Sequence, residues 1–141
     1  VKNALERVPQ GSIVLVHDGV RPLVSAELVR KLALKAEEGQ CVIPVTAVTD
    51  TLKSLVKSDV EGEFVQSGQP PDRETLFAAQ TPQAFPSEIL KNAYQRGFSP
   101  HFTDDASVVS EEKIPLTYVL GERYNIKITT PEDLEFVRKI Y

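Results

Sequence analysis

Two runs of branched apolar residues, 13–16 and 41–45, stand out near the start of the chain. Neither run alternates with polar residues, which is typical of strands buried on both faces of a parallel sheet. Pro44 lacks a backbone donor and predicts a bend in the second run. Between the runs, apolar residues recur at helical spacing from a capping Ser25 to a terminating Gly39. This part of the chain therefore predicts a strand, a helix and a second strand.

The pattern changes in the next stretch, where short mixed runs replace the apolar ones. Residues 51–57 and 63–66 predict two short strands, and the turn-forming residues 58–62 join them into a hairpin. A lone hairpin with so few apolar residues is only marginally stable in water. We therefore expect residues 47–74 to form an inserted β-arm that packs on another subunit. The alternative is a surface hairpin that packs on its own domain.

The rest of the chain returns to alternating strand and helix patterns. Hydroxyl residues followed by acids predict helix starts at Thr103 and Thr130, and Ser87 is expected to cap a helix that ends near Arg96. Strands are expected within 76–85, at 116–120 and at 125–129. Such alternation predicts an α/β fold, with a mostly parallel sheet covered by helices on both faces, in one domain spanning residues 1–141.

Composition narrows the class of protein without naming a function. The 141 residues are 41% hydrophobic and 26% charged, as expected for a globular domain, and the net charge of −4 argues against a nucleic-acid partner. The single cysteine, Cys41, excludes an intrachain disulfide. No apolar stretch is long enough to span a membrane, and no signal-peptide pattern is present, so we expect a cytoplasmic protein with no membrane partner.

Candidate chemistry begins where the first buried strand ends. There the apolar run changes to His17-Asp18-Gly19-Val20-Arg21. Ligands of open α/β sheets bind beyond the carboxyl ends of the strands, so a carboxylate and a guanidinium at this position fit an active site. The alternative is a loop that contains only an internal Asp–Arg ion pair.

Polar residues at strand ends, helix starts and the base of the arm form a wider candidate set. Its members are Asp18, Arg21, Thr51, Arg73, Thr81, Thr103 and Lys127. Three cations, one carboxylate and three hydroxyls suit a phosphate-bearing ligand, since arginine forks and hydroxyls both bind phosphate oxygens. Two members have other interpretations: Thr103 as a helix cap, and Lys127 as the solvent side of a strand.

Six short blocks resemble one known family in their order and spacing. They are His17-Asp18-x-x-Arg21-Pro22, Asp50-Thr51-Leu52-Lys53, Asp72-Arg73, Gln80-Thr81-Pro82-Gln83-Ala84-Phe85, Thr103-Asp104-Asp105-Ala106-Ser107 and Asn125-Ile126-Lys127-Ile128-Thr129. The chain from Val14 onward is similar to 2-C-methyl-D-erythritol 4-phosphate cytidylyltransferases of the non-mevalonate isoprenoid pathway.

This resemblance implies a Rossmann-like nucleotidyltransferase fold, related to nucleotide-diphospho-sugar transferases, with a β-arm that interlocks two subunits of a homodimer. It implies cytidylyl transfer from CTP to 2-C-methyl-D-erythritol 4-phosphate with Mg²⁺ or another divalent cation. Asp18, Arg21, Thr81 and Lys127 resemble the acceptor and metal–nucleotide side of the site, with Asp18 as the expected metal ligand. Thr103 is expected to bind substrate as well.

Two further residues are expected to act across the dimer. Thr51 and Arg73 resemble residues that the arm contributes to the partner's site. Lys127 and Arg73 resemble the catalytic cations that position the acceptor phosphate for attack.

The chain also departs from the family's pattern. A glycine-rich loop with Arg and Lys, which binds the CTP phosphates, is absent from these residues, so the chain resembles the C-terminal part of such an enzyme and could be inactive alone. Gly19-Val20 stands where the family often has two alanines. Two alternatives follow: a pentitol-phosphate (ribitol 5-phosphate) cytidylyltransferase, or an inactive module that binds ligands or assists assembly.

Overall fold

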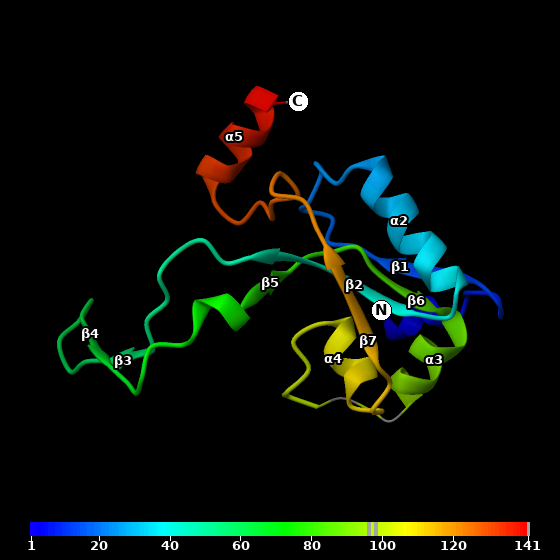
Figure 1. Ribbon diagram of the computed structural model, residues 1–141, viewed down its shortest axis with the longest axis horizontal. Helices are drawn as coiled ribbons and strands as arrows, with labels where there is room; N and C mark the ends of the chain where they lie inside the picture. Colours follow the sequence, from blue (N-terminus) through cyan, green and yellow to red (C-terminus); the bar gives the residue numbers. More distant parts are fainter. Residues whose placement is uncertain (96, 98, 141) are drawn as a thin grey trace.

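A mixed β-sheet lies at the centre of the protein and has helices on both faces (Figure 1). The computed structural model describes residues 1–95, 97 and 99–140. The strands of the sheet are β1 (Ile13–Val16), β2 (Cys41–Ala47), β5 (Phe77–Ala79), β6 (Gln83–Pro86) and β7 (Leu116–Leu120). β6 lies between β1 and β2, β5 pairs further along the same edge of β2, and β7 pairs with its other edge.

The prediction of a mostly parallel sheet is wrong. β2 and β7 pair in parallel, but β6 runs antiparallel to both β1 and β2, and β5 runs antiparallel to β2. The reason is that residues 77–86, which contain β5 and β6, run back alongside β2, with β6 between β1 and β2. β1, β2 and β7 still point the same way, so their carboxyl ends lie at one edge of the sheet. The prediction that strand 13–16 is buried on both faces is wrong, because β1 ends the strand order and all four of its residues are only partly buried.

The described helices lie on both faces of the sheet, as predicted, except for the last one, which stands away from the sheet (Figure 1). They are α1 (Lys2–Leu5), α2 (Ala26–Glu37), α3 (Ser87–Gln95), α4 (Asp105–Ser110) and α5 (Pro131–Ile140). α2 packs on a cluster that includes Val42 and Ala84, while α1, α3 and α4 pack on a second cluster that includes Cys41, Ile43 and Phe85. Because successive side chains of a strand point to opposite faces, β2 contributes to both cores.

The caps explain where two of the helices begin. Ser25 caps α2 as predicted, because its Oγ accepts the amide hydrogen of Leu28 at 3.0 Å. The predicted hydroxyl cap of α4 at Thr103 is wrong. Asp104 caps α4 instead: its carboxylate accepts from the amide of Ser107, and the Ser107 hydroxyl accepts from the amide of Asp104. This reciprocal pair satisfies two amides at once, which a lone hydroxyl does not.

Two other expectations from the sequence differ from the structure, and a third is not tested by the described residues. Residues 125–129, predicted as a strand, belong to an irregular segment between β7 and α5. Apolar and polar residues alternate there as in a strand, but the residue that this segment buries, Asn125, is polar. Ser87 is the first residue of α3 rather than its cap. The predicted helix end at Arg96 lies outside the described residues.

A small hairpin projects from the body of the protein (Figure 1). Its strands are β3 (Leu55–Lys57) and β4 (Phe64–Gln66), which pair only with each other among the described strands. Every residue of both strands is exposed. A one-turn 3₁₀ helix, η1 (Arg73–Thr75), precedes β5 on the way back to the sheet.

α5 closes the chain and begins as predicted. The Asp133 carboxylate accepts from the amides of Thr129 and Thr130, both at 2.9 Å. These bonds lower the pKa of Asp133. Across residues 1–95, 97 and 99–140, no helix is long and apolar enough to cross a lipid bilayer.

Candidate functional site

A cleft of about 400 Å³ opens where the carboxyl end of β1 meets the connection between β5 and β6 and the start of α4. Its lining combines acids, cations, hydroxyls and amides: Val16, Asp18, Arg21, Ala79, Gln80, Thr81, Gln83, Thr103, Asp104, Asp105 and Lys127. Since β6 runs antiparallel to β1, the start of β6 lies beside the end of β1. That arrangement places Thr81 next to Asp18, although the two residues are 63 positions apart in the chain.

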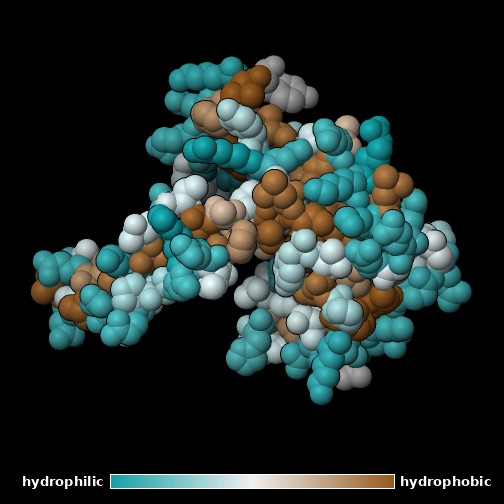
Figure 2. Space-filling model, viewed as in Figure 1, coloured by the Kyte–Doolittle hydropathy of each residue, from teal (hydrophilic) through white to brown (hydrophobic). Residues whose placement is uncertain are grey.

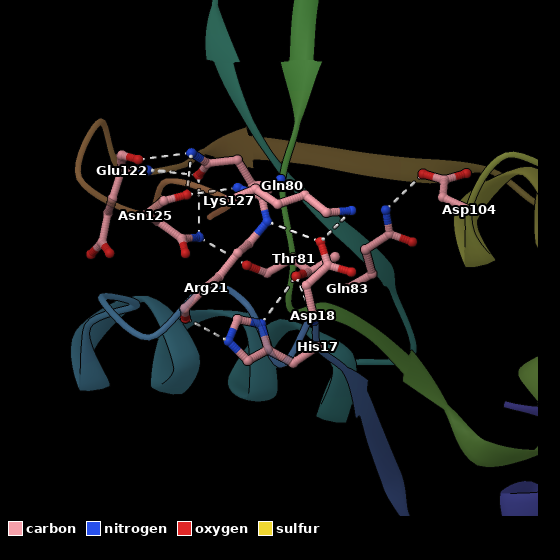
Figure 3. A network of polar contacts seen from close by, with 10 residues as sticks. All are labelled: His17, Asp18, Arg21, Gln80, Thr81, Gln83, Asp104, Glu122, Asn125 and Lys127. Atoms are coloured by element: carbon pink, nitrogen blue, oxygen red, sulfur yellow. Dashed lines mark hydrogen bonds and ion pairs between the residues drawn. The ribbon is translucent and has the colours of Figure 1, made fainter. Parts of the chain in front are cut away.

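Asp18 lies between two cations at the centre of this cleft (Figure 3). Arg21 donates from Nε to Asp18 Oδ2 at 3.1 Å, and Lys127 Nζ lies 3.3 Å from the same oxygen. Partial burial alone raises the pKa of Asp18, but the hydrogen bonds and charges of Arg21 and Lys127 outweigh it and lower that pKa below its usual value. Asp18 is therefore ionised at neutral pH.

The two cations differ in how far they reach solvent. The Arg21 side chain is 11% exposed, and its Nη1 donates to the backbone oxygen of Asn125 at 2.7 Å. Its guanidinium thus binds two protein oxygens and fixes the orientation of Asp18. The Lys127 side chain is 48% exposed. Lys127 is consequently the cation that a ligand in the cleft reaches more easily.

A histidine that sequence reasoning did not single out for a role supports the same loop. His17 Nε2 lies 3.1 Å from the backbone oxygen of Arg21, and its Nδ1 lies 3.0 Å from Thr81 Oγ1. A carbonyl only accepts, so Nε2 donates, and in the neutral ring Nδ1 accepts from the Thr81 hydroxyl. Thr81 Oγ1 in turn accepts from the amide of Asp18 at 2.9 Å. These contacts with His17 and Asp18 fix the orientation of the Thr81 hydroxyl.

The structure brings five of the seven predicted site residues together. Asp18, Arg21, Thr81, Thr103 and Lys127 line the cleft. Thr51 and Arg73 do not line it. Thr51 is exposed between β2 and the hairpin, and Arg73, at the return of the hairpin, donates to the backbone oxygen of Thr49 at 3.1 Å.

Comparison with known proteins places this geometry in a family. Residues 1–140 match the family described as 2-C-methyl-D-erythritol 4-phosphate cytidylyltransferase. The chain belongs to this family.

Relatives within the family support the assignment over almost the whole chain. The cytidylyltransferase of Bacteroides thetaiotaomicron is 46% identical over 135 residues, which are 96% of this chain and 58% of that protein. The enzyme of Geobacillus thermodenitrificans is 40% identical over 142 aligned positions, covering 99% of this chain and 59% of that protein. The chain thus spans about three-fifths of the length of these curated relatives.

A solved structure gives the same fold. The crystal structure of the 2-C-methyl-D-erythritol 4-phosphate cytidylyltransferase from Thermus thermophilus superposes with a TM-score of 0.82 at 34% identity. The match covers 98% of this chain and 65% of that one. The mixed sheet is therefore shared with a family member of known structure.

Other residues of this cytidylyltransferase-family chain build the cleft without belonging to the predicted set. Gln83 donates from Nε2 to Asp104 at 2.7 Å and accepts from the amide of Ala106 at 2.9 Å, so β6 holds the start of α4. Gln80 and Asn125, both buried, connect β6 to the segment that carries Lys127. Nothing in the sequence indicates that these two residues are buried, since glutamine and asparagine are mostly surface residues.

Proposed function

We propose that the protein transfers a cytidylyl group from CTP to 2-C-methyl-D-erythritol 4-phosphate and releases pyrophosphate, in isoprenoid precursor biosynthesis. The observation that carries this proposal is the contact of Lys127 with Asp18 in the cleft, in a chain that matches the family over residues 1–140. This contact joins two of the six sequence blocks in one cleft, where an exposed cation faces solvent.

The cleft suits this chemistry because the reaction needs positioning and charge neutralisation more than proton transfer. An oxygen of the acceptor phosphate, already ionised, attacks the α-phosphorus of CTP, and the bond to the bridging oxygen breaks as pyrophosphate leaves. No general base is required. Cations aligned with the reacting phosphates stabilise the charge that develops. Lys127 is the exposed candidate for the acceptor phosphate, and Thr103 supplies a hydroxyl nearby. The Thr81 hydroxyl, bonded to His17 and Asp18, forms part of the cleft wall.

Mg²⁺ is the metal that we propose, and Asp18 is its protein ligand. Among the described residues, no group of three or more His, Cys, Asp or Glu side chains forms a metal cage. Mg²⁺ is commonly held by one or two carboxylates together with substrate phosphates, so a single ionised Asp18 fits that metal. When bound, the ion would neutralise phosphate charge, while Arg21 keeps the Asp18 carboxylate in place.

We propose in addition that residues 47–74 form a dimerisation arm, and that Thr51 and Arg73 serve the partner's cleft. Exposed apolar side chains along the hairpin support this: Leu55, Val56, Val60, Phe64 and Val65 are each about half exposed or more. Figure 2 shows hydrophobic side chains along the projecting hairpin, among hydrophilic ones. At its base lies an apolar groove of about 710 Å³ between β5 and β7, which includes Phe77 and Leu120.

We also propose that this chain is the C-terminal part of a longer protein, whose preceding residues carry the glycine-rich loop for the CTP phosphates. The coverage of only about three-fifths of the relatives supports this. CTP, the polyol phosphate and a second copy of the chain are then the partners, and a cytoplasmic location stays a prediction.

The test is pyrophosphate release from CTP and Mg²⁺ by the full-length protein. 2-C-Methyl-D-erythritol 4-phosphate is the acceptor, and ribitol 5-phosphate is the control. Release with the first acceptor alone supports the proposal. Release with ribitol 5-phosphate alone assigns the protein to the pentitol-phosphate enzymes. Absence of pyrophosphate release with both acceptors, from a folded protein, contradicts enzymatic activity and favours a binding or assembly module.

A further inference from the structure

A buried glutamine next to the cleft makes all of its side-chain hydrogen bonds to one segment of the protein. Gln80 lies between β5 and β6 and is 6% exposed. Its Nε2 donates to the backbone oxygens of Glu122 and Asn125 at 2.8 and 3.3 Å. Its Oε1 accepts from the amide of Glu122 at 3.1 Å and from Asn125 Nδ2 at 3.4 Å. Two donors and two acceptor positions are all that a carboxamide offers, so every one is used.

The segment that Gln80 binds is shaped to receive it. Gly121 immediately precedes Glu122, and a Cβ atom on Gly121 would lie 2.4 Å from Gln80 Oε1. The φ angle of Gly121 lies outside the left-handed region, so close approach, and not backbone conformation, explains why glycine stands there. The amide of Gly121 also donates to the backbone oxygen of Val45 at 2.8 Å, which fixes this end of the segment on β2.

The same segment carries or supports both cations of the cleft (Figure 3). The backbone oxygen of Asn125 accepts from Arg21 Nη1 at 2.7 Å. Lys127, two residues later, reaches Asp18. The amide of Ile128 donates to the backbone oxygen of Val20 at 2.9 Å, which joins the segment to the loop after β1.

Residues 121–129 form neither helix nor strand. Their course therefore depends on bonds to other parts of the protein, and Gln80 provides four of these bonds within one buried side chain. Removing a buried partner leaves polar groups unsatisfied, which costs more than the bond itself is worth. Loss of the Gln80 carboxamide would leave the amide of Glu122 without its partner, and would take one of two partners from the backbone oxygens of Glu122 and Asn125 and from Asn125 Nδ2.

We infer that Gln80 is a positioning residue: it fixes the segment 121–128 so that Lys127 and Arg21 keep their places around Asp18. This inference rests on the proposed function for its catalytic consequence only. A merely structural glutamine would lower stability without acting through Lys127. The two roles therefore differ in how the Gln80 and Lys127 substitutions combine.

The first experiment is a double-mutant cycle in the full-length protein. Gln80→Met keeps the length of the side chain and removes its polar atoms. We expect it to lower kcat/KM roughly tenfold to hundredfold, mainly through kcat, because positioned cations act in the transition state. In a Lys127→Met background the same change should lower kcat/KM less than about twofold, since coupled residues are not additive. Full additivity of the two losses would overturn the inference.

Gln40→Met is the matched control. Gln40 precedes β2, at the other end of that strand from the cleft, and its side-chain amide donates to Glu38 at 3.0 Å. The Gln40→Met substitution should leave kcat/KM unchanged. Gly121→Ala should reproduce the loss of Gln80→Met, and should do less further harm in a Gln80→Ala background, where the side-chain atoms at 2.4 and 3.3 Å are gone and only the backbone oxygen of Val45 remains, at 3.3 Å. Equal harm in both backgrounds would contradict the fit between Gly121 and Gln80.

The second experiment does not depend on turnover. The Ile128 amide, bonded to Val20, reports whether the segment stays on the loop after β1. Gln80→Met should speed hydrogen exchange at this amide about tenfold or more, while amides of β2 in the core keep their rates. An unchanged Ile128 rate overturns the inference whatever the enzyme does. Absence of turnover in the unaltered protein would contradict the proposed function alone, and the exchange result would still decide the role of Gln80.

Discussion

At the scale of single residues, Asp18 shows how position decides chemistry. Its carboxylate follows the partly buried strand β1, meets Arg21 three residues later and meets Lys127 from the far end of the chain. Arg21 is the less exposed cation and uses two of its donors inside the protein, so it acts as a support for Asp18. Lys127 presents its charge to the cleft.

The depressed pKa of Asp18 leads to a prediction about acid stability. The group contributes stability that is fully present above its unfolded pKa, near 3.8, and is lost as the pH falls through the lower folded value. The melting temperature of the unaltered protein should therefore exceed that of Asp18→Asn by a constant margin between pH 7 and pH 5. The margin should shrink below about pH 4.

Thermal melts of both proteins across this pH range check the prediction. Comparing the pair cancels the other acids, which titrate in both proteins. A margin that grows as the medium becomes more acidic would mean that Asp18 is not stabilised as a carboxylate by Arg21 and Lys127.

The residue scale also shows what the sequence could and could not reveal. Asp18, Arg21 and Lys127 could be proposed because charged residues next to apolar runs are conspicuous. The buried Gln80 and Asn125 could not, because nothing in their own neighbourhood distinguishes them from surface amides. Their partners come from segments that are more than forty residues away in the chain.

At the scale of helices and strands, short helices around the cleft depend on side chains for their place. α4 has only six residues, too few to be stable by itself. Gln83 holds its first turn from β6, and the Tyr94 hydroxyl of α3 donates to Asp105 at 2.6 Å. Burial, together with this bond and the neighbouring acids, raises the pKa of Tyr94, so the phenol stays protonated and donates throughout the physiological range.

Replacing that phenol should loosen the contact between α3 and α4. We expect Tyr94→Phe to lower the free energy of unfolding by about 1.5–3 kcal/mol, the usual net worth of a hydrogen bond to a charged group. Urea unfolding measures it. Tyr124→Phe, at a side chain that is 64% exposed, is the control and should change little. Equal stability of Tyr94→Phe and the unaltered protein would show that the bond to Asp105 contributes nothing.

Elements were predicted well where local pattern decides and poorly where distant contacts decide. The strands 13–16 and 41–47 and the Ser25 cap follow from apolar runs and cap chemistry, although β1 is only partly buried. The antiparallel course of β6 does not, because alternation along the chain says nothing about a segment that returns between two strands. Residues 125–129 alternate like a strand, yet hydrogen bonds to Gln80 and Val20 take the place of a ladder.

At the scale of the whole molecule, the proposed dimer makes a sharp prediction about two inactive variants. Arg73→Ala and Lys127→Ala should each abolish most activity in the full-length protein. Mixing and re-equilibrating the two should restore about a quarter of it, because half of the dimers become mixed and each of these has one intact site. Steady-state pyrophosphate release measures this recovery.

The control is a mixture of Lys127→Ala with a Lys127→Ala, Arg73→Ala double variant, which has no intact site in any combination. Sedimentation should show dimers in every sample. Recovery no greater than in this control, with the dimers intact, would mean that Arg73 serves its own subunit or only the assembly.

The strand that returns from the hairpin has a mechanical consequence. β5 is followed by Gln80, Thr81 and Pro82, with a bend at Thr81, and then by β6, so one short length of chain joins the root of the hairpin to the cleft. In the proposed dimer, a partner that holds the hairpin would act on the same length of covalent chain that carries the Thr81 hydroxyl, so docking of two subunits would reach the cleft through the backbone itself.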